Sequence, residues 1–465
     1  MTHEWNGSRV LVLGLGDTGL SAVRWLAKRG ARLRAADSRA APPALGAVRE
    51  AAPGLDVRLG AFGEALLEGV DAVVASPGVA LREPVLRAAV RRGIDVVGDV
   101  EIFARALRGS AARVIGVTGT NGKSTVTALA AAMGAAAGWR TLACGNIGLP
   151  VLDALDSPEG AAAECFVVEL SSYQLETTAS LALDSAAMLN LTQDHMDRYD
   201  SMAEYAQAKA RIFRHARVRV VNRDDAVSRG MAAGDTFSFG LGVPASRAEW
   251  GLDAARRHLR RGDKDFLHVD VIKLQGLHNA ANALAAHALM TAVDAPPAAL
   301  SQAIREFAGL PHRATLVAEA RGVRFIDDSK GTNVGSTLAA LEGASRPVVL
   351  IAGGDGKGQD FSPLAAAVAK RARAVVLIGR DAPVLRAALA PSGVPLQDAA
   401  TMDDAVAAAF ALARPGDDVL LSPACASLDM FRNYGHRGDV FAAAARALAS
   451  GLAPAPDAPR PPGES

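Results

Sequence analysis

The stretch that most constrains the fold of this chain is residues 114–125, which read Val-Ile-Gly-Val-Thr-Gly-Thr-Asn-Gly-Lys-Ser-Thr. The apolar start predicts a strand, the glycines predict a tight loop, and the alanine-rich residues 126–137 predict a helix. A strand, a glycine-rich loop and a helix N-terminus form an anion cradle, because backbone N–H groups and the helix dipole both favour a phosphate. The sequence therefore predicts a phosphate-binding loop made of Gly119, Thr120, Asn121, Gly122, Lys123, Ser124 and Thr125.

Two side chains of this loop carry the chemistry. Lys123 would reach the terminal phosphates, and the Ser124 hydroxyl would bind Mg²⁺. The match is to a variant, because the strict spacing requires glycine at position 117, where this chain has Val117. The alternative is a plain glycine-rich turn with a solvated lysine. We favour the phosphate loop because glycine, lysine and hydroxyl all stand where nucleotide chemistry needs them.

Length, charge and cysteine usage limit the classes of protein to consider. The chain has 465 residues, half of them hydrophobic, which predicts about three domains with sizeable cores. The net charge of +1 gives no electrostatic reason to expect nucleic acid or an anionic membrane as partner. The three cysteines have no metal-ligand spacing, the N-terminus is polar, and no apolar run reaches about 18 residues. We therefore expect a cytoplasmic protein that binds neither nucleic acid nor membrane.

A second glycine-rich turn lies near the N-terminus. A predicted strand over residues 9–13 is followed by Gly14-Leu15-Gly16-Asp17-Thr18-Gly19, by a predicted helix over 20–29, and by a strand over 32–36 that closes on Asp37. Taken alone, this is a dinucleotide-binding fingerprint, so an NAD-dependent oxidoreductase built on Gly14, Gly16, Gly19 and Asp37 is one alternative. The same turn serves other nucleotide-like ligands. A further strand, over residues 70–75, ends at Ser76-Pro77-Gly78.

Polar residues follow two strands of the central region. Residues 166–170 predict a strand with Glu169 near its carboxyl end, and residues 186–191 predict a strand that runs into His195. Ligands of doubly wound sheets bind at the carboxyl ends of strands, which places Glu169 and His195 at the same edge as Ser124. A carboxylate, an imidazole and a hydroxyl around phosphates predict an Mg²⁺ site. A structural role for His195 is the alternative.

Two predicted helices carry further candidates. The helix over residues 202–215 includes Lys209, which by position alone would be an ordinary solvated lysine. The helix that begins near residue 276 places Asn279 and Asn282 on one face, because they are three residues apart. Asparagine is unfavourable inside a helix, so Asn282 either binds a ligand or serves as a cap.

The last third of the chain again alternates strands and helices. Strands are predicted over residues 323–326, 347–352, 375–378 and 418–421. The loop Gly353-Gly354-Asp355-Gly356-Lys357 lacks a following Ser or Thr, so it is not a second phosphate loop. The predicted fold class is α/β, with three doubly wound domains: a Rossmann-like domain, a central domain of P-loop type, and a C-terminal Rossmann-like domain.

The ordered set of motifs resembles the Mur ligases over about residues 8–450. The motifs are Gly119-Thr120-Asn121-Gly122-Lys123-Ser124, His195-Met196-Asp197, His278-Asn279 with Asn282, Leu310-Pro311-His312-Arg313, Asp328-Ser329-Lys330 with Thr332-Asn333, and Gly353-Gly354-Asp355-Gly356-Lys357. Within this family, Gly-Leu-Gly-Asp-Thr-Gly, His-Met-Asp-Arg-Tyr and Ser-Pro-Ala-Cys-Ala-Ser-Leu-Asp point to a member that handles D-glutamate.

The resemblance implies an ATP-dependent ligase of peptidoglycan precursor synthesis. It would add D-glutamate to UDP-N-acetylmuramoyl-L-alanine through an acyl phosphate, releasing ADP and phosphate. It implies a UDP-substrate domain over residues 1–107, an ATP-binding domain over 108–310 and an amino-acid-binding domain over 311–451, in a monomer. The proline-rich residues 452–465 are expected to be a disordered tail. A non-catalytic nucleotide-binding homologue is the other alternative, which the intact Lys123, Glu169, His195 and Lys209 disfavour.

The resemblance also implies roles for individual residues. The UDP ligand would be lined by Asp17, Thr18, Asp37, Ser38, Ser76, Pro77 and Gly78, and the rest of that substrate would meet Asn146 and His195. ATP and two Mg²⁺ ions would be held by Lys123, Ser124, Glu169 and His195, with Lys209 as a carbamate. Adenosine would meet Asn279, Asn282, Arg313 and Asp328. Glutamate would meet Lys330, Thr332, Lys357, Ser427 and the backbone near Tyr434. The catalytic residues implied are Lys123, His195 and Lys209.

Overall fold

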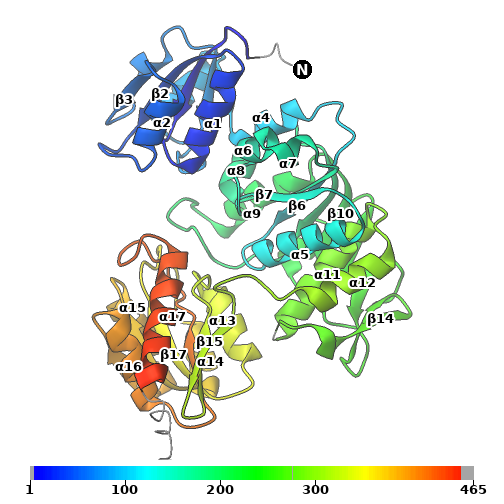
Figure 1. Ribbon diagram of the computed structural model, residues 1–465, viewed down its shortest axis with the longest axis vertical. Helices are drawn as coiled ribbons and strands as arrows, with labels where there is room; N and C mark the ends of the chain where they lie inside the picture. Colours follow the sequence, from blue (N-terminus) through cyan, green and yellow to red (C-terminus); the bar gives the residue numbers. More distant parts are fainter. Residues whose placement is uncertain (1–4, 275, 452–465) are drawn as a thin grey trace, which may run out of the picture. The chain divides into compact units, whose positions relative to one another are not determined.

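The computed structural model describes residues 5–274 and 276–451, which form three sheets flanked by helices (Figure 1). The chain divides into two compact units. The described residues of Met1–Leu191, Arg198–Lys273 and Asn279–Phe307 form the first unit, and those of Thr192–Asp197, Leu274–His278 and Ala308–Ser465 form the second. The first unit contains two of the sheets, and the second unit contains the third.

The first sheet has five parallel strands in the order β3-β2-β1-β4-β5. Its elements are β1 (Arg9–Leu13), α1 (Asp17–Lys28), β2 (Arg32–Asp37), α2 (Leu45–Ala51), β3 (Asp56–Leu59), η1 (Glu64–Leu67), β4 (Ala72–Ala75), α3 (Pro84–Arg91), β5 (Asp95–Val97) and α4 (Asp99–Ala106). The predicted strand over 9–13 is confirmed, and α1 starts three residues earlier than predicted. Because β2, β1 and β4 are neighbours, the turns that follow them share one edge of the sheet.

The central sheet has nine strands in the order β14-β13-β12-β11-β10-β9-β6-β8-β7. Its elements are β6 (Arg113–Thr118), α5 (Lys123–Ala136), β7 (Thr141–Gly145), α6 (Val151–Asp156), α7 (Pro158–Ala161), β8 (Cys165–Glu169), α8 (Ser172–Glu176), β9 (Leu183–Met188), α9 (Met202–Ala210), η2 (Arg211–Phe213), β10 (Ala216–Asn222), α10 (Ala226–Arg229), β11 (Thr236–Phe239), β12 (Glu249–Leu252), β13 (His258–Arg261), β14 (Lys264–His268), η3 (Val269–Val271), α11 (Leu277–Thr291) and α12 (Pro297–Glu306). Apolar residues of α5, α11 and α12 form the core on one face. The predicted strand–loop–helix is confirmed, with the helix beginning at Lys123.

The central sheet departs from a purely doubly wound plan. Strands β12, β13 and β14 pair antiparallel and extend the sheet at the β11 edge, which the sequence analysis did not predict. The extension is stable because Trp250 of β12 is buried in the core and donates its Nε1–H to His287 Nδ1 of α11 at 2.9 Å. The three short strands carry weak alternation, so their pattern alone does not distinguish them from loops.

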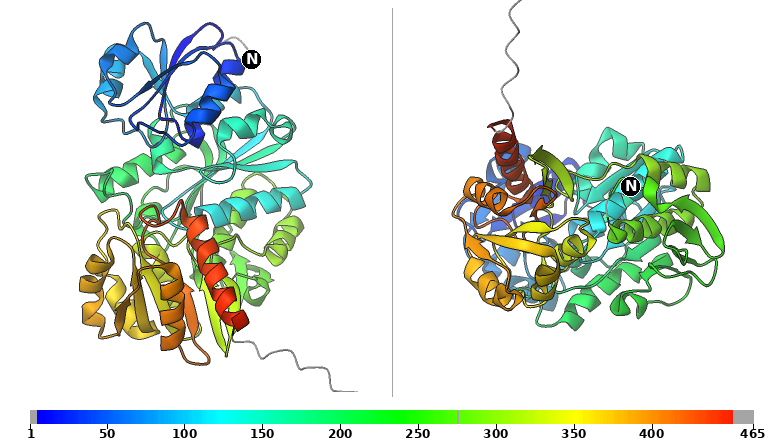
Figure 2. Two further views of the ribbon diagram at one scale, coloured as in Figure 1. Left: turned by 60° about the vertical axis from the view of Figure 1, so that its left-hand side comes forward. Right: turned by 90° about the horizontal axis from the view of Figure 1, so that it is seen from below.

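The third sheet has six strands in the order β15-β16-β20-β17-β18-β19, with β15 antiparallel to β16 and the other pairs parallel. Its elements are β15 (Thr315–Ala320), β16 (Val323–Asp327), α13 (Val334–Gly343), β17 (Val348–Gly353), α14 (Leu364–Arg371), β18 (Ala372–Ile378), α15 (Ala382–Leu389), η4 (Ala390–Ser392), β19 (Leu396–Asp398), α16 (Met402–Leu412), β20 (Asp418–Leu421) and α17 (Tyr434–Gly451). Helices α16 and α17 pack on one face and α13, α14 and α15 on the other, which is the doubly wound arrangement (Figure 2).

Two predicted features concern the chain as a whole. Within residues 5–274 and 276–451, no helix is long and apolar enough to cross a membrane. The expected tail over residues 452–465 lies outside the described residues. The three α/β domains predicted from the sequence are confirmed.

Candidate active site

The predicted phosphate loop, called the phosphate loop below, joins β6 to α5 at the carboxyl edge of the central sheet. Gly119 and Gly122 have φ angles of +150° and +83°, which glycine adopts readily and other residues do not. A Cβ atom on Gly122 would lie 2.5 Å from Asn282 Oδ1, so the space also requires glycine. Lys123 opens α5, and its Nζ donates to the carbonyl oxygens of Gly119 and Thr120 at 2.9 and 2.7 Å. The lysine thus lies folded across the loop.

Lys209 lies beneath the same loop. Its side chain is 2% exposed, and its Nζ donates to the Gly119 carbonyl oxygen at 2.8 Å. The Tyr205 ring centroid lies 4.8 Å from this ammonium, and the Tyr205 hydroxyl is 3.3 Å from Thr120 Oγ1. The alternative of a solvated surface lysine is wrong, because the helix α9 packs its last turn against the loop.

Glu169 ends β8, the neighbour of β6. Its Oε1 accepts a hydrogen bond from Asn146 Nδ2 at 2.8 Å, so two residues predicted to serve ligands lie together at this edge. Its Oε2 is buried and has no hydrogen-bond partner among the residues that the structure describes. A buried carboxylate oxygen without a donor is costly, and a hard cation would satisfy it. The residues present therefore fit an Mg²⁺ ion.

The two asparagines of α11 lie on one face, as predicted. Asn282 Nδ2 donates to Asn279 Oδ1 at 3.1 Å, and the Asn282 side chain abuts Gly122. The alternative that Asn282 caps the helix is wrong, because α11 begins at Leu277. The pair is thus held against the phosphate loop.

Two predicted ligand sets are divided between the compact units. His195 belongs to the second unit, whereas Ser124, Glu169 and Lys209 belong to the first. Asn279 and Asn282 belong to the first unit, and Arg313 and Asp328 to the second. His195 has a φ of +59°, and its backbone N–H donates to its neighbour Asp194 Oδ1 at 2.9 Å. Within the described residues, no group of three or more His, Cys, Asp and Glu side chains could hold a metal, and the predicted set contains only two of these types.

The turns of the first sheet bring its predicted residues together. Asp37 ends β2, is 2% exposed, and accepts the Leu15 backbone N–H at 2.6 Å. The Arg39 guanidinium hydrogen-bonds to this carboxylate and lowers the pKa of Asp37 to about 2. Ser76 Oγ donates to the Gly14 carbonyl oxygen at 2.8 Å, so the turn after β4 contacts the turn after β1. Asp17 and Thr18 open α1 beside them, while Ser38 and Gly78 are exposed.

Three loops meet at the carboxyl edge of the third sheet. The loop after β17 carries Lys357, and its Asp355 exchanges two backbone hydrogen bonds with Ala426, next to Ser427 in the loop after β20. The loop after β16 joins them, since the Ala424 N–H donates to the Gly331 carbonyl oxygen at 2.9 Å. These loops carry the residues predicted for glutamate, which are Lys330, Thr332, Lys357 and Ser427. Tyr434 lies beside them, with its ring centroid 3.7 Å from Lys330 Nζ.

Asp328 is a buried carboxyl group at this edge. Ser422 Oγ donates to its Oδ2 at 2.7 Å. Burial raises the pKa of Asp328 to about 7, although the Ser422 hydroxyl and the charge of Arg313 oppose the rise. Arg313 and Asp328 are therefore close enough to interact electrostatically, as their shared predicted role requires.

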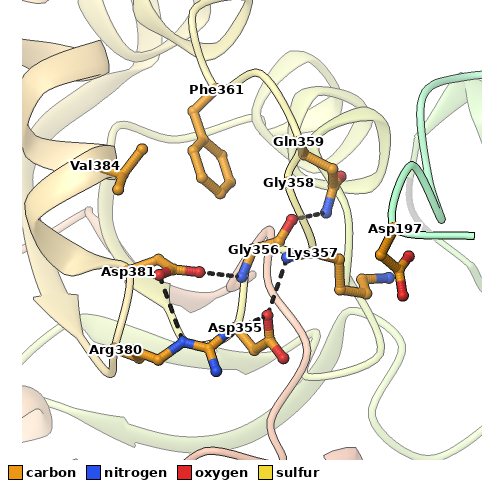
Figure 3. Close-up of a pocket in the computed structure, with 10 residues that line it drawn as sticks. All are labelled: Asp197, Asp355, Gly356, Lys357, Gly358, Gln359, Phe361, Arg380, Asp381 and Val384. Atoms are coloured by element: carbon orange, nitrogen blue, oxygen red, sulfur yellow. Dashed lines mark hydrogen bonds and ion pairs between the residues drawn. The ribbon is translucent and has the colours of Figure 1, made fainter. Parts of the chain in front are cut away.

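A pocket of about 480 Å³ opens beside Lys357 (Figure 3). Phe361 and Val384 supply its apolar surface, and Asp355, Arg380 and Asp381 supply charge. Lys357 Nζ lies 2.5 Å from Asp194 Oδ1, and both side chains are largely buried. Of the residues predicted for glutamate, Lys357 alone lines this pocket.

Sequence reasoning missed several residues at these edges. Arg437 of α17 is 1% exposed and joins two predicted loops, because it donates to the Ser329 and Cys425 carbonyl oxygens at 2.8 and 3.0 Å. Arg39 and Tyr205 were also missed. Only Arg39 had a local signal, since it stands two residues after an acidic strand end. The other two reach their sites through tertiary packing.

Comparisons with known proteins agree with this architecture. Three family models match in succession: "Mur ligase MurD-like, N-terminal domain" over residues 8–98, "Mur ligase middle domain" over 117–290, and "Mur ligase, glutamate ligase domain" over 312–425. The chain is 58% identical over 437 residues to the UDP-N-acetylmuramoylalanine--D-glutamate ligase of Methylobacillus flagellatus, covering 93% of this chain and 95% of that one. It is 51% identical to the enzyme of the same name from Nitrosospira multiformis, covering 95% and 96%.

Solved structures show the same fold at low sequence identity. The chain is similar to UDP-N-acetylmuramate-alanine ligase MurC from Thermotoga maritima, with a TM-score of 0.60 and 19% identity over 95% of this chain and 99% of that one. It is also similar to MurF from Acinetobacter baumannii, with a TM-score of 0.60 and 17% identity over 96% and 92%. Taken with the relatives above and the succession of domains, these likenesses show that the chain belongs to the Mur ligase family.

Proposed function

We propose that this chain joins D-glutamate to UDP-N-acetylmuramoyl-L-alanine at the expense of ATP, in the cytoplasm and as a monomer. The observation that carries the proposal is the phosphate-loop edge, where Lys123 opens α5, Lys209 donates to the loop carbonyl of Gly119, and Glu169 ends the strand beside β6. The substrate assignment is supported by relatives of that name that are 50–58% identical over most of the chain. The alternative function, an NAD-dependent oxidoreductase, would explain neither the phosphate loop and its lysines nor the presence of the third domain.

Each domain would then bind one of the three substrates. Residues 1–107 would bind the UDP part through the turns around Asp37 and Ser76, residues 108–310 would bind ATP, and residues 311–451 would bring the amino acid. The contacts of Asp37 with Leu15 and Arg39 support a role in shaping the first of these sites. Asn279, Asn282, Arg313 and Asp328 would receive adenosine, and the three loops of the third sheet would receive glutamate.

The chemistry requires activation of a carboxylate. An oxygen of the substrate carboxylate would attack the γ-phosphorus of ATP, ADP would leave, and an acyl phosphate would form. The amine of glutamate would then attack the acyl carbon, lose a proton, and expel phosphate. Lys123 would turn from the loop carbonyls to the γ-phosphate and neutralise its developing charge. His195 would orient the reacting carboxylate.

Glu169, Ser124 and His195 would hold Mg²⁺, which when bound neutralises phosphate charge. The unsatisfied Glu169 Oε2 supports this assignment. Lys209 would add to the set as a carbamate, formed when its neutral amine takes up CO₂ and releases a proton. The change converts a cation into an anion with two oxygen ligands, which suit a hard metal.

A coupled assay of ADP and phosphate release tests the proposal. Release should require ATP, UDP-N-acetylmuramoyl-L-alanine and D-glutamate together, and L-glutamate should not replace the D-enantiomer. Nicotinamide turnover without ADP release would support the oxidoreductase instead, and nucleotide binding without turnover would support the non-catalytic homologue. Light scattering after size-exclusion chromatography tests the monomer, whose mass should be 47.8 kDa.

A further inference from the structure

Two neighbouring loops of the third sheet are joined by contacts that the proposed function does not use (Figure 3). The loop after β17 carries Lys357, and the loop after β18 carries Arg380 and Asp381. A Cβ atom on Gly379 would lie 2.6 Å from Gly354 Cα, so the two backbones touch. The Asp381 N–H also donates to the Gly354 carbonyl oxygen at 3.0 Å. The conformation of one loop therefore depends on the other.

Asp381 stands at the N-cap of α15 but does not cap it. Aspartate at this position ordinarily accepts a hydrogen bond from an N–H group of its own helix. The Asp381 side chain makes no such bond. Its Oδ2 instead accepts the Gly356 N–H at 2.6 Å, one residue before Lys357. The Asp381 carboxylate thus stabilises the loop that carries Lys357, and not the N-terminus of its own helix.

Arg380 connects the carboxylates that hold this loop. Its Nη2 lies 2.6 Å from Asp355 Oδ1, and its Nε lies 3.6 Å from Asp381 Oδ1. Asp355 Oδ1 in turn accepts the Lys357 N–H at 3.0 Å. Lys357 has a φ of +51°, a left-handed conformation that a non-glycine residue keeps only where its surroundings impose it. These contacts supply that constraint.

We propose that Asp381 is a positioning residue that presents Lys357 to the incoming amino acid. The inference rests on the proposed function, in which Lys357 receives glutamate. Asp381 would not touch the substrate; it would fix the Gly356 N–H and so hold Lys357 in its left-handed conformation. Without this acceptor, the loop would relax, and the Lys357 ammonium, which also pairs with Asp194, would lose its fixed position at the edge of the pocket.

The test measures the KM for each of the three substrates in the full-length enzyme. Asp381→Ala should raise the KM for D-glutamate about tenfold, the equivalent of about 1.4 kcal/mol, because a hydrogen bond to a charged acceptor is lost. The KM values for ATP and for UDP-N-acetylmuramoyl-L-alanine should stay within about twofold of the parent values. The substitution does not alter the residues proposed to bind those two substrates. Asp381→Asn should recover most of the loss, because its amide oxygen can still accept the Gly356 N–H.

Asp398→Ala is the matched control. Asp398 ends β19 of the same sheet and pairs with Arg386 at 2.8 Å, but it does not line the pocket. Its variant should match the parent in all three KM values, and thermal unfolding should show that each variant is folded. Lys357→Met separates the glutamate-binding role of Lys357 from the positioning role of Asp381. If Lys357→Met raises the KM for D-glutamate and Asp381→Ala does not, the positioning role is wrong. An equal rise in all three KM values for Asp381→Ala would overturn it as well. A parent-like KM for Lys357→Met would remove Lys357 from the glutamate site, and the positioning role with it.

Discussion

At the scale of single residues, two lysines of the proposed ATP site share one carbonyl oxygen. Lys123 of α5 and Lys209 of α9 both donate to the Gly119 carbonyl oxygen, at 2.9 and 2.8 Å. Two cations at one carbonyl repel each other, and a bound triphosphate would attract Lys123 away. The conversion of Lys209 into a carbamate would remove the repulsion altogether. Each lysine can be tested separately.

Lys123→Ala should lower turnover about 10²- to 10³-fold, because it removes a positive charge directed at the transition state. ADP release measured at saturating substrates checks this. Lys264→Ala, which changes an exposed lysine of β14, is the control and should keep the parent rate. Near-parent turnover of a folded Lys123→Ala variant would refute the phosphate-loop assignment.

Lys209→Ala should be nearly inactive, and acetate should restore part of the activity by placing a carboxylate in the vacated space. Chloride at the same ionic strength should restore none. Lys209→Arg should stay inactive with either salt, because arginine is bulky and always charged. A fully active Lys209→Arg variant would mean that a plain cation suffices, and the carbamate would be excluded.

At the scale of elements, α4 couples the first sheet to the central one through buried carboxyl groups. Glu101 accepts the Ala179 and Ser180 N–H groups at 2.8 Å, and Asp99 accepts Gln174 Nε2 at 3.3 Å. Gly98, which precedes α4, packs closely against Thr177, because a Cβ atom on Gly98 would lie 2.2 Å from Thr177 Oγ1. This connection therefore combines close packing with charge burial.

The buried Asp99 makes stability depend on pH. Burial raises the pKa of the Asp99 carboxyl to about 6 from its ordinary 3.8. The folded state therefore holds more protons than the unfolded state between these values, so this group lowers stability as pH rises through that window. Asp99→Asn should raise the free energy of unfolding at pH 8 by about 3 kcal/mol, and by much less at pH 4. Urea unfolding at both values checks this, and an equal effect at both would contradict it.

At the scale of the whole molecule, the third sheet has cores of its own. Both of its apolar clusters draw their residues from the segment between Val317 and Ala449. Among the described residues, the apolar clusters around Leu11 in the first sheet and around Ile115 in the central sheet contain no residue from that segment. The third domain should therefore have most of its stabilising contacts within itself.

A fragment spanning residues 308–451 should fold alone and unfold cooperatively, as measured by circular dichroism during heating. Phe325→Ala removes a fully buried ring from one cluster and should cost about 3–5 kcal/mol, which would abolish the transition in so small a domain. A fragment without a cooperative transition would show that this domain needs the rest of the chain.

The sequence by itself determined the local chemistry. The glycines of the phosphate loop, the polar ends of β2, β8 and β16, and the spacing of Asn279 and Asn282 all follow from short-range rules, because turns, strand ends and helix faces are set by neighbouring residues. The antiparallel extension β12–β14 escaped prediction, since its stability comes from the contact of Trp250 with the distant His287. Tertiary structure alone decided the burial of Lys209, the bridging position of Arg437 and the diversion of Asp381 to Gly356. Each of these three features depends on contacts between atoms of separate elements. A local sequence pattern therefore does not indicate which side chain will be buried or which distant group it will contact.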